Sequence, residues 1–435
     1  MNGLSWPAIL RLGLVQTSLG AVVVMMTSTL NRVMVVELAL PALVPGLLVA
    51  AHHGVQILRP AWGHGSDVGG KRTPWIVAGM TTLAAGGFLA ACGVALGAAW
   101  LGLALCIAGF LAVGVGAGAA GTSVLAMLAT GVAPQRRAAA ATLVWVMMIF
   151  GFALTAPLAG HFLDPYSPQR LVEVMGAVCL AAVAVSSLAV IGVERRLDKP
   201  AAPPAHRSLK AALGEVWRDR SARRFTAFIF VSMLAYSAQE LLVEPFAGLV
   251  FGMPPGVTTK LAGLQHGGVL IGMIVVALIA SGIGGRRLGS LRGWTVVGCV
   301  ASACALVGLA ASGKFGANPL ALRGCVAALG FSNGVFAVAA IGSMMGLAGA
   351  GARGREGARM GLWGAAQALA FALGGVVGTG LADLARFVGA SPLNAYAMVF
   401  VIEAAAFVVS AEMARRLGSA KAAHEAPEGA LPAQS

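Results

Sequence analysis

Ionisable and amide side chains interrupt several long apolar segments of this sequence, where an uncompensated charge is costly. Two pairs stand out: His52 with His53, and Gln239 with Glu240, the second pair followed one helical turn later by Glu244. The other members of the set are Asn31, Gln265, His266, Gln367 and Glu403. Polar groups at such depth usually face a cavity, a partner or a substrate, so these residues are the candidates for chemistry.

The histidines and Glu240 offer different chemistry. An imidazole takes up a proton, donates a hydrogen bond or ligates a metal centre, and a buried carboxyl group serves as a proton site. Neighbouring helical residues point about 100° apart, so only one of His52 and His53 needs to face a central cavity. A packing role stays open for each histidine, for Glu240 and for Glu403. We predict a substrate site drawn from His52, His53, Asn31, Gln239, Glu240 and His266.

The segments that must position these groups are membrane spans. Of the 435 residues, 58% are hydrophobic and 11% are charged, a composition typical of polytopic membrane proteins. We predict an all-α integral membrane protein with twelve helical spans of about 20 residues each. They lie near 11–36, 43–62, 75–97, 100–124, 139–162, 171–193, 224–250, 261–282, 292–312, 321–347, 358–382 and 393–414. The 60 glycines suit helices that approach one another closely.

The net charge of +14 follows topology and does not indicate a nucleic-acid partner. Of the 30 Lys and Arg residues, 23 fall on one side of the membrane if the N-terminus is cytoplasmic. This asymmetry predicts that both termini are cytoplasmic. The six cysteines lie in apolar segments without a C-x-x-C pair, so we expect neither disulfides nor a metal site.

A hydrophilic turn at 63–72 separates the second and third spans. Its glycines, acid and bases resemble the loop motif of the major facilitator superfamily, with Gly65 and Val68 in place of the usual Leu and Arg. The residues that match are Gly63, Asp67, Gly70, Lys71 and Arg72. By this resemblance the turn is a gate, in which Asp67 accepts hydrogen bonds from the other half and holds one alternating-access state. A plain polar turn is the alternative.

The two halves of the chain carry an internal duplication. Phe152 and Asp164 recur as Phe371 and Asp383 at a constant offset, and His53-Gly54 is echoed by His266-Gly267. Two six-helix bundles related by such a duplication are the plan of the major facilitator superfamily. We predict bundles at 1–193 and 224–416, a basic cytoplasmic linker at 194–223 and a disordered tail at 417–435. The linker is either an interfacial helix or a solvated connection.

The whole chain resembles the PucC/LhaA family, the bacteriochlorophyll-delivery branch of the major facilitator superfamily in phototrophic bacteria. The resemblance begins with residues 10–14 and includes Pro45-Gly46. Its longer runs are 29–38, with Asn31, Arg32 and Glu37; 53–75, which contains the LRPAW sequence and the turn; and 240–247, which reads ELLVEPFA. It covers roughly residues 1–415.

This resemblance implies a membrane carrier and assembly factor that supplies (bacterio)chlorophyll to light-harvesting antenna polypeptides. The implied partners are the pigment or its precursor, antenna polypeptides and pigment-synthesis enzymes, in the inner (intracytoplasmic) membrane. We expect no covalent cofactor, with bacteriochlorophyll as cargo ligated by an imidazole.

Two other functions stay open, a proton-coupled solute transporter that uses Glu240 or Glu403 and a scaffold that no longer transports. The sequence shows neither a Walker motif nor an acid cluster of the DxxxD kind, so we do not expect an enzyme.

Overall fold

The computed structural model of the chain describes residues 4–59, 62, 71–133, 136–194, 218, 220–281, 289–314, 318–349 and 356–422. Within these residues, eleven helices are long and apolar enough to cross a membrane, and a twelfth apolar helix is shorter. The predicted all-α membrane architecture is therefore confirmed.

The first half of the molecule holds the elements before the linker. They are α1 (Trp6–Val24), η1 (Met25–Leu30), η2 (Val33–Glu37), α2 (Leu43–Val55), η3 (Gln56–Leu58), α4 (Thr73–Ala95), α5 (Trp100–Gly131), α6 (Arg137–Phe162) and α7 (Pro168–Val190). The segments η1 and η2 are π-helical turns that continue α1, so the first span runs without a break from Trp6 to Glu37. Such turns widen a helix locally and are frequent at functional sites.

The second half repeats the plan with six helices. They are α9 (Arg220–Phe251), α10 (Pro255–Ser281), α11 (Leu291–Ser312), α12 (Pro319–Gly349), α13 (Glu356–Phe387) and α14 (Pro392–Ala422).

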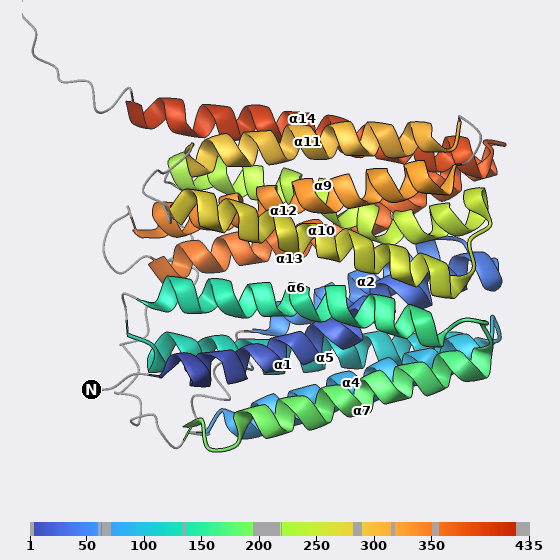
Figure 1. The fold of residues 1–435 in the computed structure, drawn as a ribbon, viewed down its shortest axis with the longest axis horizontal. Helices are drawn as coiled ribbons and strands as arrows, with labels where there is room; N and C mark the ends of the chain where they lie inside the picture. Colours follow the sequence, from blue (N-terminus) through green and yellow to red (C-terminus); the bar gives the residue numbers. More distant parts are fainter. Residues whose placement is uncertain are drawn as a thin grey trace, which may run out of the picture.

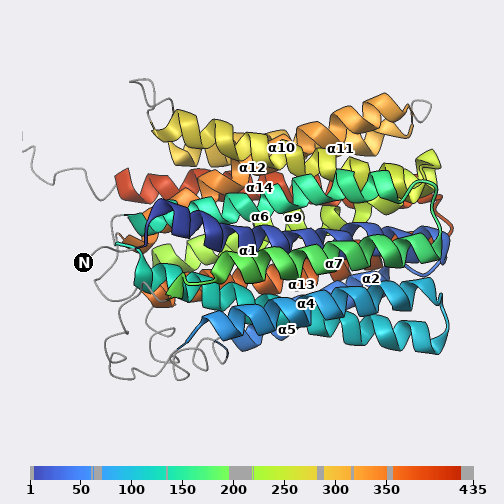
Figure 2. The same cartoon turned by 60° about the horizontal axis from the view of Figure 1, so that its bottom comes forward.

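The helices run roughly parallel to the long axis of the molecule (Figure 1), and the described parts of both chain ends lie at the same end. We call this the terminal end and the opposite one, where α9 turns into α10, the far end. The halves meet along two seams, α6 against α10 and α2 against α13. Figure 2 shows the same bundle from another side, with α4, α5 and α7 on the outside of the first half.

Close backbone approach explains why glycine lines the α6–α10 seam. A methyl group added at Gly160 would lie 2.6 Å from the carbonyl oxygen of Gly256, and the reverse change would give the same distance. The seam is thus built at its far end on direct contact of two backbones, which only glycine permits.

Several boundaries differ from the predicted ones; the first span, for example, begins at Trp6 and not at 11. The second span is a shorter apolar helix from Leu43 to Leu58, and Arg59 and Trp62 are also helical, so its predicted end at 62 is not contradicted. The last helix continues to Ala422, past the expected start of the disordered tail at 417. Most of the predicted linker, and the tail beyond 422, lie outside the described residues.

Candidate functional site at the seam between the halves

A chain of aromatic rings crosses the α2–α13 seam. The ring centroid of His53 on α2 lies 5.3 Å from that of Phe371 on α13, in a tilted arrangement. Phe371 in turn lies 5.9 Å from Tyr236 on α9. Residues from both halves therefore form one row of flat surfaces in the middle of the molecule.

Glu240 extends this row with a carboxyl group. It follows Tyr236 by four residues on α9, so the two side chains share one face of the helix. His53, Phe371, Tyr236 and Glu240 are all half-buried, in contrast to the fully buried residues around them. The row thus offers an imidazole, a phenol and a carboxyl group beside aromatic faces, which suits a flat ligand with polar groups at its edge.

Among the described residues, His52 touches this row through His53, whose ring it meets edge-on with the ring centroids 4.8 Å apart. Its Nε2 lies 3.0 Å from the amide nitrogen of Gln56 one turn away, and its side chain is buried. Its backbone packs on α5, where a methyl group at Gly114 would lie 2.6 Å from the carbonyl oxygen of His52. Neighbouring positions on a helix point about 100° apart, and for this reason His53 faces the seam whereas His52 faces its own half.

The other predicted residues occupy separate places. Gln239 is fully buried in α9, and neither polar atom of its side-chain amide has a hydrogen-bond partner among the described residues. Glu403 on α14 is likewise buried, and within the described part of the chain neither of its carboxyl oxygens has a hydrogen-bond partner. His266 packs edge-on against Phe152 at 4.8 Å in the α6–α10 seam. The six predicted site residues therefore lie in several places: His53 and Glu240 lie in the aromatic row, and His52 meets it through His53.

Asn31 belongs to a polar network at the far end. Its Nδ2 donates to the carbonyl oxygen of Leu241 on α9 at 2.8 Å. Beside it, the Ser28 hydroxyl donates to the Glu244 carboxylate, and the hydroxyls of Thr29 and Thr259 are 3.0 Å apart. Each of these contacts joins the first span to the second half.

Arg32 completes this network. Its guanidinium is buried, pairs with Glu37 and donates to the carbonyl oxygen of Met253 at 2.6 Å. A buried charge is tolerated only when it is paired and hydrogen-bonded, and Arg32 meets this condition by bridging η2 and the turn that follows α9. The network fastens the two halves together at the far end.

Asp383 makes a second far-end connection. Its carboxylate oxygens accept hydrogen bonds from the backbone N–H groups of Ala42 at 3.1 Å and Leu43 at 2.7 Å. These groups are among the unpaired donors at the start of α2, where a negative charge is favourable. A residue of the second half thus caps a helix of the first.

The predicted gating turn falls mostly outside the described residues, which include neither Gly63, Asp67 nor Gly70. Lys71 is exposed, whereas Arg72 is buried and donates to the Ala126 carbonyl oxygen at 2.6 Å and the Thr130 hydroxyl at 2.7 Å. These partners lie on α5 in the same half. The gating role of the turn remains a prediction.

Glu194 secures the start of α4 at the terminal end. Its carboxylate accepts hydrogen bonds from the backbone N–H groups of Arg72 and Thr73, the latter at 2.9 Å. Partial burial acts to raise the pKa of Glu194, but the hydrogen bonds from Thr73 and Arg72 outweigh it, and the pKa lies below its usual value.

Sequence reasoning missed Tyr236 as a site residue and used Phe371 only as a mark of the duplication. Both had a detectable signal, since Tyr236 precedes Glu240 by one turn and Phe371 matches Phe152. The capping role of Asp383 had no comparable signal, because its partners are more than 300 positions away in the chain.

Comparison with known proteins places the chain among photosynthesis-related membrane proteins. The model of the PUCC protein family matches residues 29–422. The chain is 54% identical to the Bacteriochlorophyll synthase 44.5 kDa chain of Rhodobacter capsulatus, over 98% of each sequence. It is 30% identical to Protein PucC of the same species, over 92% of this chain and 90% of the relative.

Solved structures agree on the fold. The nucleoside transporter NupG superposes with a TM-score of 0.69 at 12% identity, over 94% of this chain and 99% of NupG. PepTSo2 gives 0.69 at 16% identity, over 96% of this chain and 99% of that protein. At these identities the likeness shows a transporter fold and nothing about the substrate.

Proposed function

Since the chain belongs to the PUCC protein family, we propose that it carries bacteriochlorophyll or a precursor and supplies it to light-harvesting antenna polypeptides. The names of the relatives connect the family with bacteriochlorophyll and with PucC, and the fold is that of transporters. In this proposal the chain moves pigment without changing its covalent structure, so any synthase activity would reside in other proteins.

The observation that carries the proposal is the aromatic row from His53 through Phe371 to Tyr236. Its half-buried residues come from both halves, as expected for a site between two bundles that move against each other. A neutral imidazole is a common axial ligand of metals held in flat macrocycles. His53 would therefore ligate the central Mg of the pigment, with Phe371 against the ring face.

Glu240 and Tyr236 would bind the edge of the ring. A protonated carboxyl group and a phenol are hydrogen-bond donors, and ring carbonyl oxygens are acceptors. The far-end network holds the halves together on one side of this site. In this arrangement pigment would enter when the seam parts toward the terminal end.

The proposed setting follows from the same assignment. We place the protein in the inner (intracytoplasmic) membrane with both termini in the cytoplasm, as the distribution of Lys and Arg predicts. Antenna polypeptides and pigment-synthesis enzymes are the proposed partners.

The test is to purify the protein in mild detergent from a pigment-producing phototroph and to record its absorption spectrum. We expect near-infrared pigment absorbance in the wild type, a loss of most of it in His53→Ala, and a partial loss in Glu240→Gln. His266→Ala is the matched control, because His266 makes the corresponding histidine–phenylalanine contact in the α6–α10 seam, away from the aromatic row. Its absorbance should stay near the wild-type level.

Other outcomes point to the alternative functions. A colourless wild-type protein that still captures antenna polypeptides would make the chain a scaffold. A colourless protein without such partners, but with uptake driven by a pH gradient, would make it a solute transporter. Equal loss of pigment in His266→Ala and His53→Ala would remove the aromatic row as the site.

A further inference from the structure

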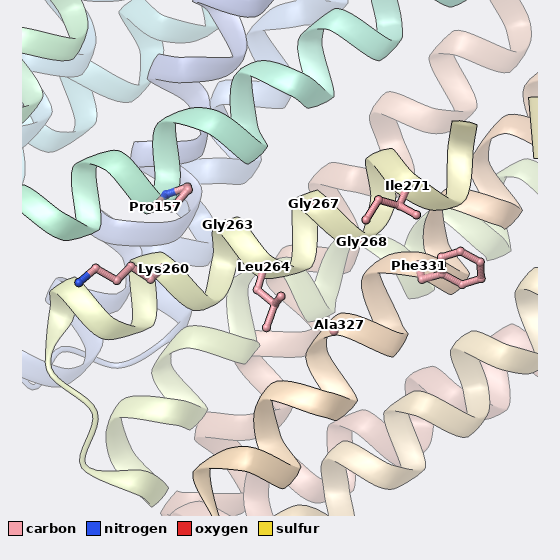
Figure 3. A pocket seen from close by; sticks show the side chains of 9 residues that line it. All are labelled: Pro157, Lys260, Gly263, Leu264, Gly267, Gly268, Ile271, Ala327 and Phe331. Carbon is pink, nitrogen blue, oxygen red and sulfur yellow. The ribbon is translucent and has the colours of Figure 1, made fainter. Parts of the chain in front are cut away.

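A groove lies on the outer side of the α6–α10 seam, away from the aromatic row. Its volume is about 490 Å³, and its walls come from α6, α10 and α12. Figure 3 shows Lys260 at one end and Ile271 and Phe331 at the other. Leu264, Ile271 and Phe331 are among the exposed apolar side chains of the described residues, so the groove opens toward the lipid.

The floor of the groove is made by the backbone of α10. Gly267 lies in it with open space where a side chain would stand, whereas at Gly263 an added methyl group would lie 2.5 Å from the ring of Pro157. The groove follows α10 from Lys260 to Ile271, about 16 Å at 1.5 Å per residue. The empty space is therefore long and narrow, and its surface is almost wholly apolar.

Lys260 is the charged residue of the groove lining. It makes neither a hydrogen bond nor an ion pair with another described residue, and it lies near the far end of α10, five residues after Pro255. A lysine in this position extends its ammonium group toward the membrane–water interface. It places one positive charge where the headgroup of a lipid chain in the groove would lie.

We propose that the groove binds an anionic phospholipid, with one acyl chain along α10 between Pro157 and Phe331 and the phosphate at Lys260. A transmembrane helix does not fit inside it, because a helix about 10 Å wide and 16 Å long fills about 1,200 Å³. The positive charge selects an anionic headgroup over a zwitterionic one.

The lipid would contact both halves at once, because Pro157 belongs to the first half and the other lining residues to the second. A ligand that bridges two moving bodies stabilises the arrangement in which it fits, and the arrangement in turn favours the ligand. The bound lipid therefore holds the α6–α10 seam closed.

The experiment is native mass spectrometry of the purified full-length protein, delipidated and then titrated with phosphatidylglycerol or with phosphatidylcholine of identical chains. For the wild type we expect one retained phospholipid, with about fivefold preference for phosphatidylglycerol, the effect of one lysine beside an anionic lipid. Lys260→Gln should retain a lipid but lose the preference.

Gly267→Leu should lose retention of both lipids, because the new side chain fills the groove. Gly324→Leu on α12 is the matched control, since Gly324 is exposed and also has open space around it. Equal retention in Gly267→Leu and Gly324→Leu would overturn the proposal. So would a wild type without preference between the two lipids, or a retained mass that belongs to pigment.

Discussion

The two seams between the halves carry the same pair of side chains in different surroundings. In the α2–α13 seam His53 of the first half lies against Phe371 of the second. In the α6–α10 seam His266 of the second half lies against Phe152 of the first. The duplication thus placed one histidine–phenylalanine contact at each seam, with the roles of the halves exchanged.

The surroundings of the two pairs have diverged. His266 and Phe152 are both buried and meet edge-on, an arrangement typical of packed interiors. His53 and Phe371 are half-buried and tilted, and the row continues to Tyr236 and Glu240. We infer that the α6–α10 pair supports the structure, whereas the α2–α13 pair is available to a ligand.

Truncating the two phenylalanines is the strongest test of this difference. Phe152→Ala should lower the free energy of unfolding by about 3 kcal/mol, the low end for a buried phenylalanine, because lipid also solvates apolar groups well. Phe371→Ala should cost less than half as much but should remove most bound pigment. Unfolding in mixed detergent micelles and the absorption spectrum measure the two effects. Equal destabilisation by both variants would erase the proposed difference between the seams.

Adding one methyl group tests the tightness of the seams with a smaller effect. In Gly160→Ala the new methyl group meets the backbone of Gly256, which cannot move aside as a side chain does. We expect a loss of about 1–3 kcal/mol of stability, the usual cost of overpacking. Gly54→Ala, where the structure leaves open space, should be neutral or stabilising by up to about 1 kcal/mol. Thermal unfolding of both variants in the same detergent gives the comparison, and a stable Gly160→Ala would show that the backbones are not in contact.

The duplicated acids provide a third comparison. Asp383 caps α2 through two backbone N–H groups. Its counterpart Asp164 lies beside Gly256 near the start of α10, without a hydrogen bond to α10 in the described part of the chain. Asp383→Ala should therefore cost about 1 kcal/mol of stability, as for other lost helix caps, and Asp164→Ala clearly less. Denaturant titration of the two variants decides between this expectation and equal roles for the two acids.

Much of the fold was predictable because it depends on short-range patterns. Apolar segment lengths predicted the spans, and the repeat of Phe152 and Asp164 predicted two related bundles. The different directions of His52 and His53 also followed from helical geometry, although not which one faces the seam.

The remainder of the site depends on contacts that no local pattern contains. The substrate role of Asn31 stays a prediction, but no local pattern indicated that its side chain joins the first span to α9. Gln239 and Glu240 are adjacent, but the rotation of α9 buries one of them fully and leaves the other half-exposed beside the aromatic row. Such choices depend on how two halves dock, which the sequence of either half alone does not reveal.

The smallest predicted effect concerns a contact that lies outside both seams. Glu194 caps the start of α4 within the first half, and its pKa lies below the usual value because the folded state stabilises its charged form. Its contribution to stability is therefore complete above the ordinary glutamate pKa of about 4.3 and declines as the pH falls through the lowered value. Glu194→Gln should be slightly less stable than the wild type at pH 7, and the two should converge in acid. Unfolding curves at several pH values measure this difference in stability.

Pigment binding at pH 7 should be unchanged in Glu194→Gln, because the aromatic row in the α2–α13 seam does not depend on this cap. A loss of pigment in this variant would extend the site to the terminal end of the first half.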